Sequence, residues 1–264
     1  MDEDAQAPMN YQPSSLWGIL PDGLERRLDD CLDRAPQGAR VFFRADDVGA
    51  PGKKYRSMME VFLNRRVPLS PAVVPVWLNE SRVPAITKDA VDPGMFCWHQ
   101  HGYRHKNHEA GGKKMEFGDG RGKDAVVRDV ARGMERLYAL LRGLYRPVFT
   151  PPWNRCGEVL LGVLSEFDFA AVSRTPGARP APPVELRDIP VNVDLHTRKE
   201  PDPERDWGGL FAELAAALES GTCGVMLHHQ RMNDNAVAFL DLLCARLSRK
   251  PGVELAHLGH LAGI

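Results

Sequence analysis

The sequence lacks several features that would assign it to a common class of protein. No apolar run reaches the length of about 20 residues that a membrane-spanning helix needs, so we expect no membrane insertion. Acidic and basic residues nearly cancel, with 35 Asp and Glu against 34 Lys and Arg, and this balance leaves no overall field to recruit nucleic acid. These absences favour a small or neutral molecule as the partner.

Cysteine is also scarce. The five cysteines are odd in number, widely separated, and form no C-x-x-C pair, so we expect buried thiols in a reducing compartment rather than a disulfide framework. The first residues are acidic and show neither the basic nor the apolar region of a secretory signal. The sequence therefore predicts a cytoplasmic protein.

What the sequence does contain is an alternation of short apolar runs with longer segments of helical period, which is typical of βα units and a parallel sheet. Strands are expected at 40–45, 69–76, 95–100, 147–150, 168–173, 189–194, 224–228 and 253–256. Helices are expected at 54–65, 123–143, 155–166, 206–219 and 235–248. This pattern predicts an α/β fold, a distorted (β/α) barrel of seven to eight strands over residues 39–264. Residues 1–38 are expected to form an N-terminal extension packed on the barrel.

Unusual polar residues fall where the expected strands end. In a parallel barrel these ends converge on one face and carry the catalytic groups. The residues concerned are Asp46 and Asp47 after the first strand, His101 after the third, Trp153 and Asn154 after the fourth, Asp194 after the sixth, and His228 and His229 after the seventh. The sequence thus predicts an active site at this face.

Two of these groups suggest a metal. Adjacent carboxylates after the apolar run 41–43 repel each other and lose solvation, which a bound cation would relieve, although an Asx turn before Gly49 is the plain alternative. Four histidines fall within residues 99–108, and a helical turn starting at Gly102 would bring His101 and His105 to one side. A general histidine-rich metal tract is the other interpretation.

Two imidazoles and one carboxylate leave coordination positions open for water and substrate, as a catalytic metal site requires. The same set serves non-haem iron oxygenases, but those usually lie on double-sheet β folds, so hydrolysis is favoured here. Zinc is the metal that these ligand types favour. Iron, cobalt, nickel and manganese stay compatible with them.

Four motifs, in order, carry a resemblance to a known family. They are Ala-Asp-Asp-Val-Gly at 45–49, His-Gly-Tyr-Arg-His at 101–105, Pro-Pro-Trp-Asn at 151–154 and Met-Leu-His at 226–228. With them the chain resembles the polysaccharide deacetylase superfamily (NodB-like, carbohydrate esterase family 4) from about residue 40 to 230. The segments around Arg44 and Val67 look closer to its divergent branches.

The resemblance implies a role for each matched residue. Asp46 is the expected base, Asp47, His101 and His105 the expected metal ligands, and His228 the expected general acid. His229 stays an alternative acid, and because side chains alternate along a strand only one of the two can face the metal. His99 and His108 are alternatives to the two histidine ligands.

The chain also departs from the family pattern. The third motif usually brings an arginine that orients the catalytic aspartate, yet Phe149-Thr150 stands there, so Arg44 or Arg155 is expected to replace it. Asp194 is our candidate for the acidic residue that supports the acid histidine. A backbone N–H near Trp153 is expected to stabilise the oxyanion, while the Trp153 ring and Asn154 are expected to contact substrate.

Together these features predict a metal-dependent hydrolase of amide C–N bonds, which removes an acetyl or other acyl group from an N-acetylated sugar or glycan intermediate. Two alternatives remain open. One is a carbohydrate- or metal-binding domain without turnover, and the other is an amidohydrolase acting on a non-sugar amide.

Overall fold

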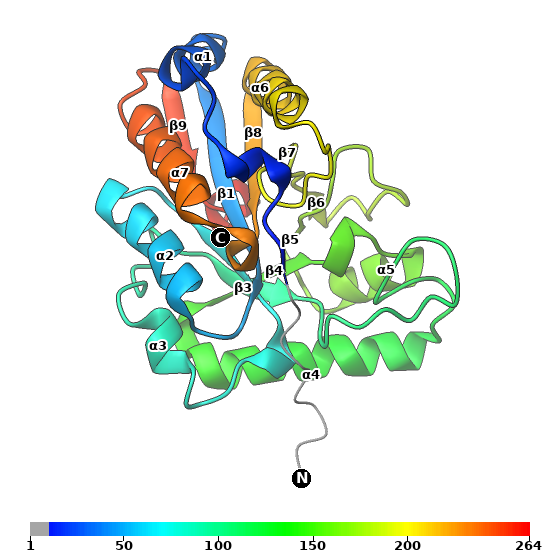
Figure 1. Cartoon of the computed structure of the whole chain (residues 1–264). Helices are drawn as coiled ribbons and strands as arrows, with labels where there is room; N and C mark the ends of the chain where they lie inside the picture. Colours follow the sequence, from blue (N-terminus) through cyan, green and yellow to red (C-terminus); the bar gives the residue numbers. More distant parts are fainter. Residues whose placement is uncertain (1–10) are drawn as a thin grey trace.

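Parallel strands form the centre of the structure, a computed structural model that describes residues 11–264 (Figure 1). The strands pair in the order β6-β5-β4-β3-β2-β1-β8-β7, and β9 pairs with the first residues of β1. Their bounds are β1 (Ala39–Val48), β2 (Ser70–Val73), β3 (Trp98–His101), β4 (Tyr145–Thr150), β5 (Ala171–Val172), β6 (Arg187–Asp188), β7 (Val193–Asp194), β8 (Thr222–Leu227) and β9 (Val253–Ala256).

The sheet curls into a barrel that is open on one side. Within residues 11–264 no strand pairing joins β6 to β7, the two ends of the sheet order. Strands β5, β6 and β7, which lie toward these two ends, have two residues each. The expected α/β fold, a distorted (β/α) barrel, is therefore confirmed.

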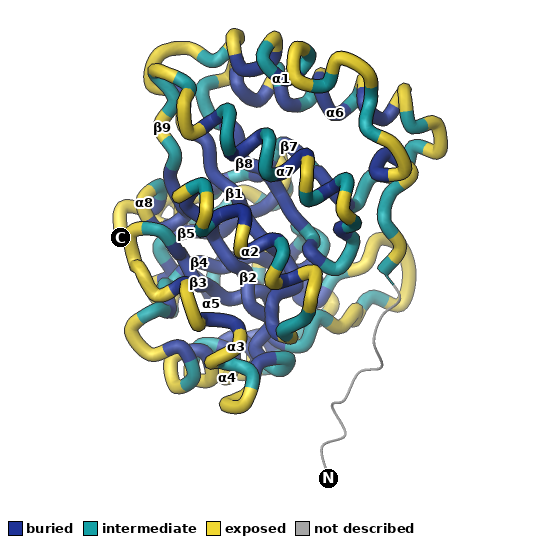
Figure 2. The backbone as a smooth tube through the Cα atoms, turned by 60° about the vertical axis from the view of Figure 1, so that its left-hand side comes forward, coloured by how far each residue is buried: buried dark blue, intermediate teal, exposed yellow. Residues whose placement is uncertain are grey.

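Helices cover the outside of the sheet (Figure 1). All five expected helices are present, and the additional α1, α3 and α8 are short. Their bounds are α1 (Leu24–Leu32), α2 (Lys53–Arg65), α3 (Val83–Thr87), α4 (Lys123–Leu141), α5 (Glu158–Glu166), α6 (Pro203–Glu219), α7 (Asp234–Leu247) and α8 (Leu258–Ala262). Figure 2 shows the central strands buried and the outer turns of the helices exposed, whereas β6 and most of β9 are only partly covered.

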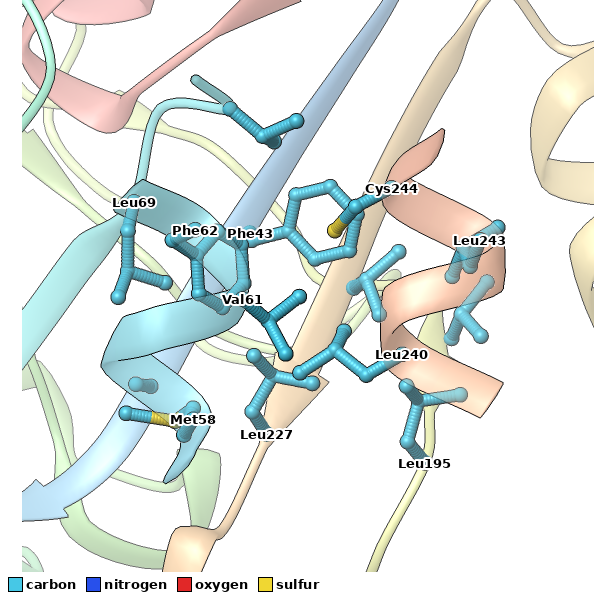
Figure 3. Packing of buried hydrophobic residues seen from close by; sticks show 14 of the residues in the cluster. Phe43, Met58, Val61, Phe62, Leu69, Leu195, Leu227, Leu240, Leu243 and Cys244 are labelled. Carbon is cyan, nitrogen blue, oxygen red and sulfur yellow. The ribbon is translucent and has the colours of Figure 1, made fainter. Parts of the chain in front are cut away.

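Alternation along β1 divides its side chains between two hydrophobic clusters. Phe43 packs outward against α2 and α7, with its ring 5.2 Å from that of Phe62 (Figure 3). Phe42 lies in the cluster that also holds Val148, Met226 and Leu258 of α8. Because side chains alternate with a period of two, Arg44 and Asp46 follow Phe42 to the inner side. The pleat of β1 thus turns polar side chains toward the centre of the barrel.

The part of the N-terminal segment that the structure describes packs on the barrel. Trp17 is fully buried, its ring lies 5.3 Å from Trp207 and 5.5 Å from Phe239, and its Nε1 donates to the Leu195 carbonyl at 3.1 Å. Residues 1–10 of the expected extension lie outside the described residues. The chain therefore approaches the mouth of the barrel before entering α1.

The cysteines agree with the expectation from composition. All five are buried and free, as predicted. No helix between residues 11 and 264 has both the length and the apolar character that a membrane span requires.

Candidate active site

The carboxyl ends of β1, β3, β4 and β8 meet at a pocket of about 900 Å³. This volume lies within the range of small-molecule sites. Of the predicted site residues, those lining the pocket are Asp46, Asp47, His101, His105, Trp153, Asn154, Arg155, Asp194 and His228. Residues from distant parts of the chain are thus brought together as expected for the catalytic face of a parallel barrel.

Asp47, His101 and His105 bring three ligand atoms together. Oδ1 of Asp47 lies 3.2 Å from Nε2 of His101 and 3.1 Å from Nε2 of His105. The three atoms lie within 4.8 Å of one another. These are the three residues that the sequence predicted as metal ligands.

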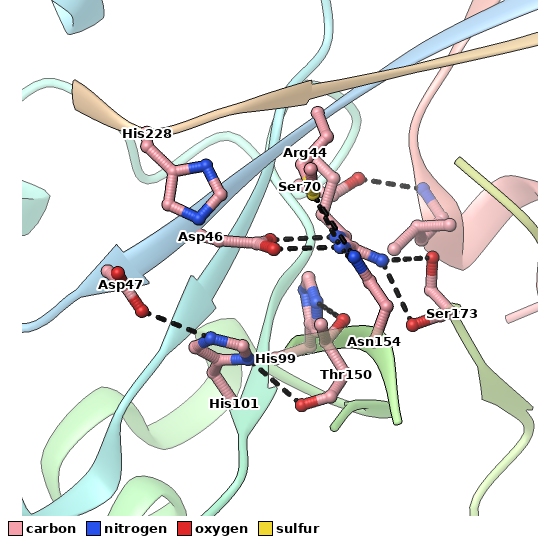
Figure 4. A network of polar contacts seen from close by, with 12 residues as sticks. Arg44, Asp46, Asp47, Ser70, His99, His101, Thr150, Asn154, Ser173 and His228 are labelled. Carbon is pink, nitrogen blue, oxygen red and sulfur yellow. Dashed lines mark hydrogen bonds and ion pairs between the residues drawn. The ribbon is translucent and has the colours of Figure 1, made fainter. Parts of the chain in front are cut away.

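The protonation of the two imidazoles suits a metal. Nδ1 of His101 lies 2.9 Å from the Thr150 carbonyl, which can only accept, so Nδ1 carries the hydrogen and Nε2 of the neutral ring offers its lone pair (Figure 4). Burial lowers the pKa of His105 to about 4, which keeps this ring neutral as well. The lone pairs of both rings and Oδ1 of Asp47 therefore converge, and a cation would satisfy all three.

The carboxylates and imidazoles of this group shift one another's pKa values. Burial lowers the pKa of His101, but the hydrogen bond to Asp47 and the charges of Asp46 and Asp47 outweigh burial and raise it. The same histidines hold the pKa of Asp47 well below its usual range in spite of burial. The donor set of two imidazoles and a carboxylate fits zinc or a similar divalent ion.

The turn that carries His105 differs from our expectation. The prediction of a helical turn from Gly102 is wrong, because residues 102–105 form a bend in which Gly102 and His105 have positive φ, 59° and 56°. A Cβ at residue 102 would lie 2.1 Å from Oε2 of Glu116. The Glu116 carboxylate accepts from the N–H of Tyr103 at 3.2 Å and of Arg104 at 2.7 Å, and so shapes the bend.

Arg44 holds Asp46 in a bidentate ion pair (Figure 4). Its Nε and Nη2 each donate to one carboxylate oxygen at 2.7 Å, and its Nη1 donates to the Ser173 carbonyl and hydroxyl, both at 2.9 Å. Burial would raise the pKa of Asp46, but Arg44 and nearby histidines lower it. The carboxylate is therefore ionised and fixed in orientation. Arg155, the alternative partner, instead reaches the Lys114 carbonyl at 3.4 Å.

The two histidines after β8 point in different directions. His228 lines the pocket, as its strand parity with Met226 requires. His229 packs against the ring of Tyr55 at 5.4 Å, on the side of α2. In the described residues Nδ1 of His228 is buried and has no hydrogen-bond partner. The geometry therefore favours His228 over His229 as a group facing the pocket.

Other predicted residues have partners that limit what they can do. Asn154 Oδ1 accepts from Arg44 at 2.6 Å, so its amide supports the Arg44–Asp46 pair. Asp194 accepts from the N–H of His196 at 3.0 Å and of Thr197 at 2.9 Å, and no hydrogen bond or ion pair within residues 11–264 joins it to His228. The Trp153 ring lies 4.6 Å from the His105 ring and forms a wall of the pocket.

The remaining histidines of the cluster are not part of the triad. Nδ1 of His99 lies 3.0 Å from the Cys97 carbonyl and its Nε2 lies 2.9 Å from Oγ1 of Thr150, so both ring nitrogens are engaged inside the barrel. Burial lowers the pKa of His99 to about 3. His108 lies on the exposed loop, and its N–H donates to the Met115 carbonyl at 2.9 Å.

Three residues near the site were not predicted. The Tyr11 hydroxyl lies 3.4 Å from Oδ2 of Asp47, whereas the two histidines lie next to Oδ1. Nδ1 of His196 accepts from the His228 N–H at 3.0 Å. Glu116, described above, is fully buried although its sequence neighbourhood is rich in Gly and charge. No periodicity or motif in the sequence marks any of the three.

Comparisons with known proteins support the fold. No family model matches the chain, and no curated protein matches it either. Among solved structures, a protein described as a polysaccharide deacetylase from Mycobacterium smegmatis has 18% identity and a TM-score of 0.68, over 86% of this chain and 90% of that one.

Two further structures share the architecture. The family 4 carbohydrate esterase from Streptomyces lividans, solved with acetate, has 15% identity and a TM-score of 0.51 over 83% of this chain and 92% of that one. A family 4 pseudoenzyme from Bacillus anthracis has 12% identity and a TM-score of 0.51 over 85% and 65%. The chain therefore has the NodB-like fold of polysaccharide deacetylases, and the resemblance seen in the motifs is confirmed at the level of the fold.

Proposed function

We propose that this chain is a metal-dependent hydrolase that removes an acetyl or other acyl group from an N-acetylated sugar or glycan intermediate. The observation that carries the proposal is the convergence of three elements on one pocket. These elements are the Asp47, His101 and His105 ligand set, the oriented carboxylate of Asp46, and the imidazole of His228. The fold shared with deacetylases supports the same assignment.

Asp47, His101 and His105 would hold the metal, and zinc is the ion that these ligands favour. When bound, such an ion polarises the acyl carbonyl and lowers the pKa of a bound water. The Trp153 side chain would line the acyl site next to His105.

Asp46 is the proposed base. Its lowered pKa keeps it ionised at neutral pH, and Arg44 holds both of its oxygens, so that it can accept a proton from water in one defined orientation. His228 is the proposed acid that protonates the leaving amine. The backbone N–H of His228 donates a hydrogen bond to Nδ1 of His196. This contact fixes the position of the backbone that carries the His228 imidazole.

The test is acetate release by the zinc-loaded protein from N-acetylglucosamine and its oligomers. General bases typically contribute about 10²–10⁴-fold, so Asp46→Asn is expected to lose activity by that factor and to keep its zinc. Asp241→Asn, which changes a partly exposed carboxylate that does not line the pocket, is the matched control and is expected to keep full activity. Wild-type turnover by Asp46→Asn would overturn the assignment of the base.

A second candidate is a binding domain without turnover. The presence of a pseudoenzyme among the structural neighbours makes this class relevant, because the fold alone does not require activity. Its main support in the sequence is the altered third motif. Arg44 supplies a guanidinium to Asp46 from within β1, which weakens that support. Metal-loaded protein that binds acylated sugars but releases no acetate from them would favour the binding domain over the hydrolase.

A further inference from the structure

Five cationic side chains line the pocket that holds the candidate metal ligands, and within residues 11–264 none of them forms an ion pair. We call them the cationic set: Lys106, Lys114, Arg155, Lys199 and Arg231. Four carboxylates line the same pocket. Asp46 pairs with Arg44, Asp47 belongs to the candidate metal ligands, and Glu213 shares Arg198 with Asp206. Asp194 accepts from Thr197, which carries no charge. With Asp46 matched by Arg44 and Asp47 by a metal, five cations of the lining stand against two carboxylates, so positive charge is in excess.

The cationic set reaches the pocket from both sides of the metal ligands. Lys106 and Lys114 follow β3, and Arg155 follows β4, whereas Lys199 follows β7 and Arg231 follows β8. In the sheet order, β3 and β4 lie on one side of β1, and β8 and β7 lie on the other. The whole chain has a formal net charge of −1, so this concentration of positive charge is local.

Arg231 shows that part of the set is built into the structure. Its Nη1 donates to the Gln12 carbonyl at 3.2 Å, and its guanidinium lies 5.2 Å from the centre of the Tyr11 ring. Its Nε is buried and has no hydrogen-bond partner in the described part of the chain. A buried donor without an acceptor is uncommon and costs stability, which an anionic oxygen would relieve. Guanidinium groups match phosphate and carboxylate oxygens in geometry.

We propose that the pocket takes an anionic acylated substrate, in which a phosphate or carboxylate group binds the cationic set while the acyl group lies at the metal ligands. This inference rests on the proposed function, because it assigns a substrate class to the same site. A neutral glycan would leave the excess of positive charge in the pocket uncompensated. An anionic substrate would compensate it, because members of the cationic set lie on both sides of the metal ligands.

The experiment compares three acylated amino sugars by isothermal titration calorimetry: N-acetylglucosamine, N-acetylglucosamine 1-phosphate and N-acetylmuramic acid. The zinc-loaded Asp46→Asn variant is used to prevent turnover. Metal-free wild-type protein is titrated in parallel, which removes direct contact between metal and anion. At least one anionic sugar is expected to bind about tenfold tighter than the neutral one at low ionic strength in both proteins, and the advantage is expected to fall as salt is added.

A pair of double variants assigns the effect to the cationic set. Lys106→Gln with Lys199→Gln removes two exposed cations from the pocket, and Lys53→Gln with Lys88→Gln removes two exposed lysines that do not line it. Only the first pair is expected to reduce the preference for the anionic sugars, to about threefold or less. Equal binding of all three sugars, or an equal loss in both double variants, would overturn the inference.

Turnover separates this inference from the proposed function. Acetate release from neutral and anionic sugars with equal kcat/KM and equal binding would leave the hydrolase standing and overturn the anionic substrate. Preferential binding of an anionic sugar that depends on Lys106 and Lys199, without any acetate release, would keep the anionic ligand and overturn the hydrolase.

Discussion

Replacement of Arg44 by methionine is expected to leave a buried carboxylate without its counter-charge. Both side chains of the Arg44–Asp46 pair are almost fully buried, with 0% and 4% of their surface exposed, and two hydrogen bonds of 2.7 Å join them. Removal of one partner of a buried pair costs about 3–5 kcal/mol. The Ser173 and Asn154 groups also lose their donor. We therefore expect the free energy of unfolding to fall by about 3 kcal/mol or more.

The chain offers a matched control of the same geometry. Arg65 holds Asp241 through hydrogen bonds of 2.7 and 2.6 Å, but these side chains are 35% and 39% exposed. Exposed pairs contribute about 0–1 kcal/mol, so Arg65→Met is expected to cost no more than that. Both arginines hold their aspartate through the same pair of hydrogen bonds. The difference between the two variants therefore reports the burial of the pair together with the contacts to Ser173 and Asn154 that only Arg44 makes.

Urea denaturation of the metal-free protein at pH 7, followed by circular dichroism, measures both effects. The double variant Arg44→Met/Asp46→Asn removes the unpaired Asp46 carboxylate as well as Arg44. Its loss in free energy of unfolding is therefore expected to be smaller than the sum of the losses in the two single variants by about 2 kcal/mol. If Arg44→Met costs no more than Arg65→Met, or if the single effects simply add, the argument from a buried and compensated charge is wrong.

Three further predictions concern the metal ligands and the unpredicted residues around them. His101→Ala and Asp47→Ala are each expected to abolish stoichiometric zinc in the purified protein, measured by atomic absorption, because each removes one of three ligands. Tyr11→Phe is expected to weaken zinc about tenfold in a chelator competition, because the hydroxyl lies beside Oδ2 of Asp47, whereas exposed Tyr138→Phe should leave the affinity unchanged. Burial raises the pKa of Glu116 from 4.5 to about 7, so its contribution to stability is present below pH 4.5 and is lost as the pH rises through 7. The unfolding free energy of the wild type, measured relative to Glu116→Gln, should therefore decline by about 3 kcal/mol between pH 5 and 8.

Each of these has a result that contradicts it. Full zinc content in both ligand variants would place the metal elsewhere. Equal zinc affinity in Tyr11→Phe and wild type would show that the N-terminal contact does not support Asp47. Parallel stability curves for Glu116→Gln and the wild type would mean that the carboxyl is not titrating near neutral pH.

The sequence was sufficient where the signal is local. The alternation along β1 places Phe42, Arg44 and Asp46 on one side of the strand, and the same parity distinguishes His228 from His229. Apolar stripes with helical period located α2, α4 and α7 within one or two residues. Strand β6 and helices α3 and α8 were not predicted, because elements of two to five residues are too short to show a period.

Tertiary structure decided which side chains surround those groups. Arg44 rather than Arg155 holds Asp46, Glu116 shapes the bend that carries His105, and Tyr11 reaches Asp47 across 36 positions of sequence. The cationic set joins loops that follow four different strands. Such contacts depend on which loops meet at one edge of the sheet, and the hydrophobic pattern of the sequence does not predict this. The sequence by itself determined the ligand types and the strands that present them, whereas the partners that orient and charge the site were decided only when the barrel brought its loops together.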